Sequence, residues 1–313
     1  AKVKKEFVCS ECGYKAVKYI GVCPTCRKFG TLEEVIIESK PVNKDPLIAN
    51  TLSSSEKPKK LKDVKVSDIE RYKSGIGEFD RVLGGGIVID SINIITAPPG
   101  AGKSTLLLQV ANILADNDLK ILYVSGEESE SQVRLRADRI LSKGISENLY
   151  IKSEMNVNHI LKDIKDVNPN LVIIDSIQRV FSPDIDNVLG GDKQVNLCSS
   201  LLSNVAKDSE NPIAMFFVGQ MTKEDELRGS RELEHMVDGM FYLDSELGNS
   251  LRIFRSTKNR FGSTEEVGLF EMNEYGMDSI DNPSKYFISD RTKPISGSIV
   301  TMIKEGSRNI AIE

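Results

Sequence analysis

The chain has 313 residues, of which 41 are Lys or Arg and 46 are Asp or Glu, so its formal net charge is −5. Hydrophobic residues make up 40% of the sequence, which supplies a sizeable core and excludes a collagen-like or wholly disordered chain. No apolar run reaches the roughly 18 residues of a membrane span and no secretion signal opens the chain, so we expect a cytoplasmic protein of about two domains.

The first predicted element is a metal-binding module built on four cysteines. Cys9 and Cys12 form one C-x2-C pair, and Cys23 and Cys26 form another after ten intervening residues. Each such turn directs two thiolates inward, so two turns complete the tetrahedral sulfur shell that Zn²⁺ prefers. A pair of disulfides is the alternative, which the spacing and an intracellular setting disfavour. We expect a structural zinc that supplies the folding free energy of a module too short for a hydrophobic core.

A C4 zinc ribbon is predicted over 1–37, with residues 31–37 as its closing strand. A flexible linker is expected over 38–65, because prolines, a serine run and lysines replace any apolar periodicity there. Residues 1–30 carry seven bases and two acids, a net charge of +5, on an otherwise acidic chain. Such a basic head is compatible with a nucleic-acid contact or with a solvated, lysine-rich terminus.

The next predicted elements form a nucleotide site. Residues 91–96 are predicted to be a buried strand and residues 106–115 a helix, with a glycine-rich loop between them. This is the strand–loop–helix context of a Walker A phosphate loop, whose backbone N–H groups and helix N-terminus form a nest for phosphates. Its predicted nucleotide-binding residues are Ala97, Pro98, Pro99, Gly100, Ala101, Gly102, Lys103, Ser104 and Thr105.

Individual residues of this loop have distinct expected roles. Gly100 and Gly102 allow the backbone to approach the phosphates. Lys103 can reach the β and γ phosphates, and Ser104 offers its hydroxyl to Mg²⁺. Ala97 departs from the strict motif by replacing its first glycine, at the tolerant position next to the strand. The loop therefore predicts a nucleotide site with Mg²⁺; the family resemblance given below implies ATP as the substrate.

Three further strands are predicted to end in side chains that complete this site. Asp175 follows an apolar run as a Walker B acid and would hold a water of the Mg²⁺ shell. Parallel strands deliver their carboxyl ends to the ligand crevice, so Glu127 or Glu128 would orient the attacking water. We favour Glu127; the alternative is a solvent-facing acid at a helix start. Gln220 ends another strand, and its amide could hydrogen-bond the γ phosphate.

The remainder of the chain is predicted to be richer in antiparallel strands. A polar loop without periodicity is expected over 222–235, either a functional loop or disorder. A compact basic tip over 258–262 carries Lys258 and Arg260. Antiparallel strands are expected around it, at 240–244, 251–256 and 267–272.

Together these motifs resemble those of the bacterial RadA (Sms) DNA repair proteins, which are RecA-like ATPases. The resemblance rests on the two C-x2-C pairs and on the segments 75–86, 99–105, 122–129, 233–238 and 258–262. It implies an α/β fold with a RecA-like P-loop ATPase domain over 66–283. Residues 284–313 would be the truncated start of a Lon-protease-like domain.

The resemblance also implies roles for residues outside the phosphate loop. It places Lys258 and Arg260 in the ATP site of a neighbouring subunit. It assigns phosphate contacts with DNA to Lys223, Arg228 and Arg231, and it makes the loop over 181–193 face DNA as well.

The activity that the resemblance implies is that of a DNA-dependent ATPase and branch-migration helicase. Members of the family form hexameric rings that move on single-stranded DNA and process recombination intermediates. The expected partners are single-stranded or branched DNA and recombinase or replicative-helicase-type repair proteins, with no membrane. Two alternatives stay open: a KaiC-like or replicative-helicase-like ATPase, and a nucleotide-gated scaffold that binds repair partners with little turnover.

Overall fold

The structure is a computed structural model of the chain. It divides into two compact units, Ala1–Val64 and Lys65–Glu313, which are described separately. No helix among the residues described is long and apolar enough to cross a membrane. The described residues are 4–10, 14–16, 20–37, 60, 70–207, 211–220, 231–245, 250–288 and 297–313.

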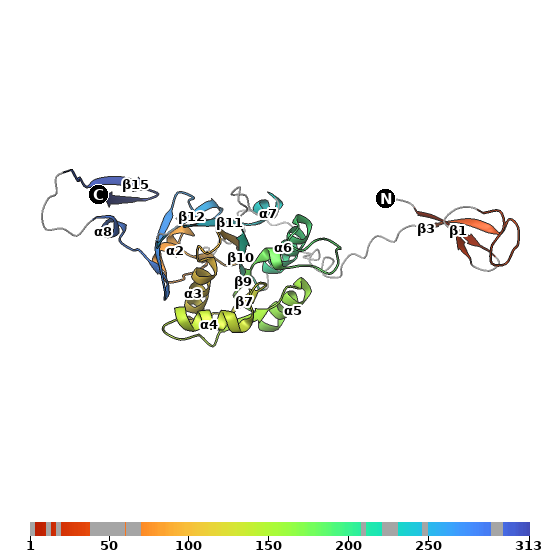
Figure 1. Cartoon of the computed structure of the whole chain (residues 1–313), viewed down its shortest axis with the longest axis horizontal. Coiled ribbons are helices and arrows are strands. Elements are labelled where there is room, and N and C mark those ends of the chain that lie inside the picture. Colours follow the sequence, from red (N-terminus) through yellow and green to blue (C-terminus); the bar gives the residue numbers. More distant parts are fainter. Residues whose placement is uncertain are drawn as a thin grey trace. The chain divides into compact units, whose positions relative to one another are not determined.

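The first unit contains a three-stranded antiparallel sheet in the order β2-β1-β3 (Figure 1). β1 pairs with β3 along its full length, which confirms the predicted closing strand to within one residue. The predicted linker over 38–65 lies outside the described residues except for residue 60. The strands are β1 Lys4–Cys9, β2 Lys15–Ala16 and β3 Leu32–Ile37.

The second unit is built on a nine-stranded sheet in the order β14-β13-β12-β11-β6-β10-β9-β7-β8. The six strands from β11 to β8 are parallel and the other three extend the sheet antiparallel. The parallel strands are β6 Ile92–Ala97, β7 Ile121–Ser125, β8 Leu149–Ser153, β9 Leu171–Asp175, β10 Ala214–Gln220 and β11 Gly239–Ser245. The antiparallel strands are β12 Leu251–Asn259, β13 Val267–Asn273 and β14 Gly276–Ser279.

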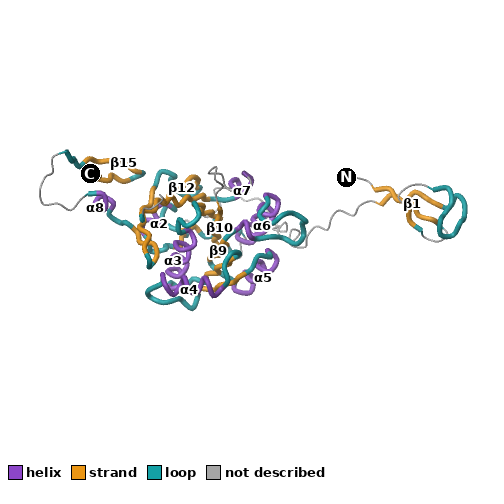
Figure 2. The backbone as a smooth tube through the Cα atoms, viewed as in Figure 1, coloured by secondary structure: helices purple, strands orange, loops and turns teal. Residues whose placement is uncertain are grey.

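Alternate residues of the central strands supply two separate cores, because successive side chains of a strand point to opposite faces. Ile173 and Phe216 belong to the core beneath α2, α3 and α4, whereas Ile174 and Phe217 belong to the core beneath α5 and α6. Figures 1 and 2 show these helices on the two sides of the sheet. The helices are α2 Gly77–Val82, α3 Lys103–Asp116, α4 Glu130–Ile140, α5 Val157–Val167 and α6 Asp192–Ala206.

Two boundaries differ from those expected from sequence. The segment 231–236, predicted as part of a polar loop, forms helix α7 Arg231–Met236. Leu233 and Val237 are both fully buried, and two apolar residues four apart were too short a signal to predict a helix. β12 continues to Asn259 rather than ending at residue 256, so Lys258 lies in a strand and not in a turn.

A β-hairpin near the end of the second unit packs against the rest of that unit. Its strands are β15 Thr301–Glu305 and β16 Arg308–Ile312, preceded by the short helix α8 Pro283–Phe287. The two terminal guanidinium nitrogens of Arg308, Nη1 and Nη2, donate to Glu78 of α2 at 2.9 and 3.0 Å, and Glu78 is nearly fully buried. That residues 284–313 start a Lon-protease-like domain stays a prediction.

Candidate nucleotide site and metal centre

The phosphate loop connects the end of β6 to the start of α3. Gly100 and Gly102 have φ values of +79° and +105°, a left-handed backbone conformation that residues with a Cβ rarely adopt. Gly102 is the N-cap of α3, whose first turn contains no acidic residue, so its N-terminal N–H groups favour an anion. Lys103 Nζ donates to the carbonyl of Ala97 at 3.1 Å, which folds the side chain back over the loop. The helix begins at Lys103, three residues earlier than predicted.

The carboxylates of Asp175, at the end of β9, and of Glu127, just after β7, lie near Lys103. Ser125 and Asp175 are register partners at the carboxyl ends of β7 and β9, so the residues that follow them meet at one edge of the sheet. Burial lowers the pKa of Lys103, and the charges of Asp175 and Glu127 oppose that shift. The structure thus brings together the lysine and the two acids that the sequence selected.

Glu127 is held by hydrogen bonds from two other strands. Its Oε1 accepts from Ser176 Oγ at 2.6 Å and from Gln220 Nε2 at 2.7 Å. Gly126 makes this approach possible, because a Cβ there would lie 2.7 Å from Cβ of Arg179. The sequence predicted Gln220 as a contact of the γ phosphate, whereas here its amide contacts the carboxylate beside that position.

The neighbouring acid Glu128 is turned away from this cluster. Its carboxylate forms an ion pair with Arg136 of α4, and its backbone N–H donates to Ser125 Oγ at 2.9 Å. The following residue, Ser129, starts α4 with a capping box to Gln132. The turn therefore presents Glu127 to the phosphate loop and uses Glu128 to anchor the helix.

Asp175 has a partner that sequence reasoning missed. The hydroxyl of Tyr123, on β7, donates to Asp175 Oδ2 at 2.5 Å. Burial raises the pKa of Tyr123 well above its ordinary value, and the charge of Asp175 adds to the shift, so the phenol keeps its proton. Ser104 at the start of α3 and Asp175 at the end of β9 offer the oxygen donors that Mg²⁺ prefers, so these residues fit the expected ion.

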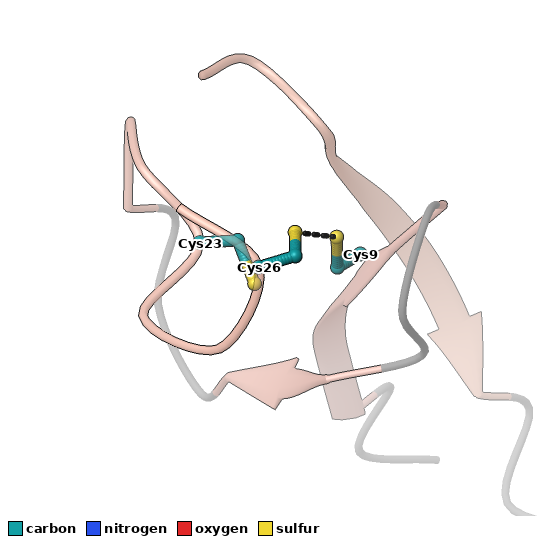
Figure 3. Close-up of side chains that lie close together, drawn as sticks. All are labelled: Cys9, Cys23 and Cys26. Carbon is teal, nitrogen blue, oxygen red and sulfur yellow. Dashed lines mark hydrogen bonds between the residues drawn. The ribbon is translucent and has the colours of Figure 1, made fainter. Parts of the chain in front are cut away.

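Three of the four ribbon cysteines lie in the described part of the chain, and their sulfurs cluster. Cys9, Cys23 and Cys26 have sulfur atoms that all lie within 4.8 Å of one another (Figure 3). The Sγ atoms of Cys9 and Cys26 are 3.7 Å apart. Tetrahedral zinc with bonds of about 2.3 Å separates its sulfurs by ~3.8 Å, whereas a disulfide bond is about 2.05 Å long. The cluster therefore fits zinc; Cys12 lies outside the described residues.

Comparisons with known proteins cover both units. A family model described as an AAA domain matches residues 55–189, and one described as a rubredoxin metal binding domain matches residues 7–34. DNA repair protein RadA of Bacillus subtilis (strain 168) is 42% identical over 314 residues, covering 100% of this chain and 68% of that protein. The protein of the same name from Streptococcus pyogenes serotype M1 is 44% identical over 313 residues, covering 100% and 67%. The chain belongs to the bacterial RadA family.

Solved structures with the same fold are more distant in sequence. The RadB recombinase superposes with a TM-score of 0.52 at 19% identity, covering 67% of this chain and 99% of that one. A DnaB-like replicative helicase gives a TM-score of 0.57 at 19% identity, covering 68% of this chain and 62% of that one. These likenesses establish the RecA-like ATPase fold of this RadA family member.

The basic tip lies at the opposite edge of the sheet from the phosphate loop. Arg260 Nη1 pairs with Asp238 Oδ1 at 2.8 Å, and Asp238 Oδ2 accepts the N–H of Ile92 at 3.0 Å. Ile92 begins β6, whereas the phosphate loop follows its last residue. Since a strand rises about 3.3 Å per residue, the two ends of β6 are ~16 Å apart. The tip of a RadA subunit is thus remote from that subunit's own phosphate loop.

The second cation of the tip is also held by its own chain. Lys258 Nζ donates to the carbonyls of Glu234 and Val237, at 2.7 and 2.8 Å, at the C-terminal end of α7. Burial lowers the pKa of Lys258, and the charge of Arg260 adds to that shift. Both cations are therefore engaged within the subunit.

A cleft of about 660 Å³ opens beside Glu127. Glu127 and Gln220 form one wall, and the segment 188–192 forms another. Gln194, almost fully buried, holds the preceding turn through its bonds to the backbone of Ser182. The loop over 181–193 that was predicted to face DNA thus borders the nucleotide site.

The remaining predicted DNA contacts lie largely outside the described part of the chain. Lys223 and Arg228 fall in 221–230, which the structure does not describe. Arg231 begins α7, but its side chain is not described. Their contact with DNA stays a prediction.

Proposed function

We propose that this RadA family member is an ATP-driven motor that remodels single-stranded and branched DNA, acting as a branch-migration helicase on recombination intermediates. The observation that carries the proposal is Glu127, held by Ser176 and Gln220 beside the phosphate loop. A carboxylate fixed at this place is suited to orient a water for attack on a γ phosphate. The family relationship and the RecA-like fold support the ATPase assignment.

In this mechanism the phosphate loop binds the triphosphate through its backbone N–H groups and Lys103. The lysine leaves the carbonyl of Ala97 and turns to the phosphates, whose charge offsets the burial cost of its ammonium. Mg²⁺, when bound by Ser104 and through water by Asp175, would neutralise phosphate charge. Glu127 then accepts a proton from the attacking water.

Gln220 gives this site a route to DNA. Its amide bonds Glu127, and the next residues, 221–230, carry Lys223 and Arg228. An exchange of Gln220 between the carboxylate and the γ phosphate would therefore displace the start of the segment that is predicted to bind DNA. We expect DNA binding to be independent of base sequence, because Lys and Arg contact phosphates.

The position of the tip favours an assembly of several subunits. Lys258 and Arg260 lie ~16 Å of strand away from their own phosphate loop, so a catalytic role for them requires a neighbouring copy. We propose a homo-oligomeric ring, with six subunits as the expected number. In this ring Arg260 of the tip would leave Asp238 and stabilise the negative charge that develops on the γ phosphate in the neighbour's ATP site. Its proposed partners are recombinase or replicative-helicase-type repair proteins.

The decisive test compares Glu127→Gln with Glu128→Gln. ATP hydrolysis and binding of a fluorescent ATP analogue are measured with and without single-stranded DNA. We expect DNA to stimulate hydrolysis by the unsubstituted protein. Glu127→Gln should lower turnover about 10²-fold or more while nucleotide binding persists, and Glu128→Gln, whose carboxylate pairs with Arg136, should retain hydrolysis. Nucleotide binding with negligible turnover in the unsubstituted protein would instead identify a nucleotide-gated scaffold.

A further inference from the structure

Tyr123 occupies an unusual place for a core aromatic residue. Its side chain is 1% exposed and belongs to the apolar core beneath α3. A buried phenol needs a hydrogen-bond partner, and the partner of Tyr123 belongs to the nucleotide site. Its hydroxyl donates to Asp175 Oδ2 at 2.5 Å.

The direction of this bond determines how the acid is oriented. The phenol uses its only proton on Asp175, so Oδ2 of the carboxylate is engaged. This leaves Oδ1 to accept from a metal-bound water.

A hydroxyl on β7 therefore aligns the acid that ends β9. We propose that Tyr123 is a positioning residue for Mg²⁺, which holds Asp175 in the arrangement that binds the water shell of the ion. The inference rests on the proposed function, because it requires that the site binds Mg²⁺ with ATP. Outer-shell hydrogen bonds of this type commonly change metal affinity 10- to 100-fold.

A packing role for Tyr123 gives a different expectation. A phenylalanine ring fills the same volume of the core, so packing alone would make Tyr123→Phe nearly neutral for the ion. Positioning requires the hydroxyl and therefore predicts a defect in Mg²⁺ dependence with little change in fold. The matched control is Tyr150→Phe on the adjacent strand β8, because that side chain is 39% exposed.

The experiment titrates Mg²⁺ into the full chain with a fluorescent ATP analogue and follows nucleotide binding rather than turnover. We expect Tyr123→Phe to raise the Mg²⁺ concentration at half-saturation about tenfold, while binding in excess chelator and the thermal transition stay close to those of the unsubstituted protein. Tyr150→Phe should match the unsubstituted protein throughout. A Tyr123→Phe titration that coincides with it overturns the inference.

A second set of variants separates positioning from a general loss of structure. Asp175→Ala removes the group that Tyr123 aligns, so adding Tyr123→Phe to it should produce a smaller further shift than Tyr123→Phe produces alone. Fully additive shifts would contradict the proposal. If the unsubstituted protein binds the nucleotide without any dependence on Mg²⁺, the proposed function fails together with this inference, whereas normal dependence with an unchanged Tyr123→Phe curve contradicts the inference alone.

Discussion

The two edges of the parallel sheet hold their charged side chains in opposite ways. At the carboxyl edge, Glu127 and Asp175 are hydrogen-bonded by neutral groups, which keeps their negative charge available to a ligand. At the amino edge, Arg260 is paired with the buried Asp238, and Lys258 is bound by backbone carbonyls. The first edge is an assembled site within one chain, whereas the cations of the second must leave their partners before they can act elsewhere.

The largest expected effect on ATP hydrolysis comes from a substitution at the carboxyl edge. Lys103→Ala removes the cation that reaches the phosphates, so we expect ATP hydrolysis to fall by about 10²–10³-fold. Lys120→Ala is a suitable control, since Lys120 precedes β7 at the opposite end of the strand from the nucleotide site. Steady-state phosphate release measures the effect, and hydrolysis that persists in Lys103→Ala would remove the phosphate loop from the mechanism.

The contrast between the edges also explains which features were predictable. Asp175 ends an apolar run, Glu127 follows another after two intervening residues, and Lys103 follows the glycine-rich loop after a third. The rule that parallel strands end at one edge brings these residues together without knowledge of side-chain packing. Tyr123 gave no signal, because an aromatic residue within an apolar strand looks the same whether its hydroxyl meets the core or a functional acid.

The contacts of the tip were unpredictable for another reason. The bond between Arg260 and Asp238 depends on the register of β11 and β12, which contains an irregularity between Met240 and Phe241. A shift of that kind is not visible in sequence periodicity. The residues of the nucleotide site can be predicted from the order of the strands along the chain. The contacts of the tip depend on the register between β11 and β12.

A substitution in the tip should have a smaller effect on turnover. It tests whether the active site is formed by one chain or completed by a neighbouring chain. Arg260→Ala should lower hydrolysis about 10- to 100-fold and leave binding of the nucleotide to the subunit nearly unchanged, because the arginine is remote from its own phosphate loop. Arg255→Ala serves as the control, since Arg255 is an exposed cation on β12, the strand that Arg260 directly follows.

Mixing experiments distinguish a role in a neighbouring subunit from a local one. Arg260→Ala subunits keep an intact phosphate loop, and Lys103→Ala subunits keep an intact tip. If the tip acts across a subunit boundary, mixtures of the two should hydrolyse ATP faster than the sum of the separate proteins. Activity that stays at that sum, or impaired nucleotide binding by Arg260→Ala, would place the arginine within its own subunit.

The smallest expected effect on turnover concerns the support beneath the tip. Glu78 of α2 accepts both guanidinium contacts from Arg308, one from Arg81 at 2.9 Å and the N–H of Leu269 at 2.9 Å. Replacing this carboxylate by an amide removes the charge partner of Arg308 in a largely buried setting, whereas Arg81 keeps its ion pair with Glu266. We expect Glu78→Gln to lower the free energy of unfolding by about 2 kcal/mol, which is less than for a fully buried pair.

This loss should be local to the hairpin and to α2. Hydrogen exchange of β15 and β16 should accelerate in Glu78→Gln, while nucleotide binding is retained, because none of the contacts described for Glu78 involves the phosphate loop. Glu271→Gln is the control, since that carboxylate is exposed on β13 and bonds only Ser250 among the contacts described. Because Asn259 of the tip bonds the carbonyl of Val82 in α2, a small fall in hydrolysis that accompanies the faster exchange would show that the hairpin supports the tip. Unchanged exchange would show that apolar packing, rather than Glu78, holds the hairpin in place.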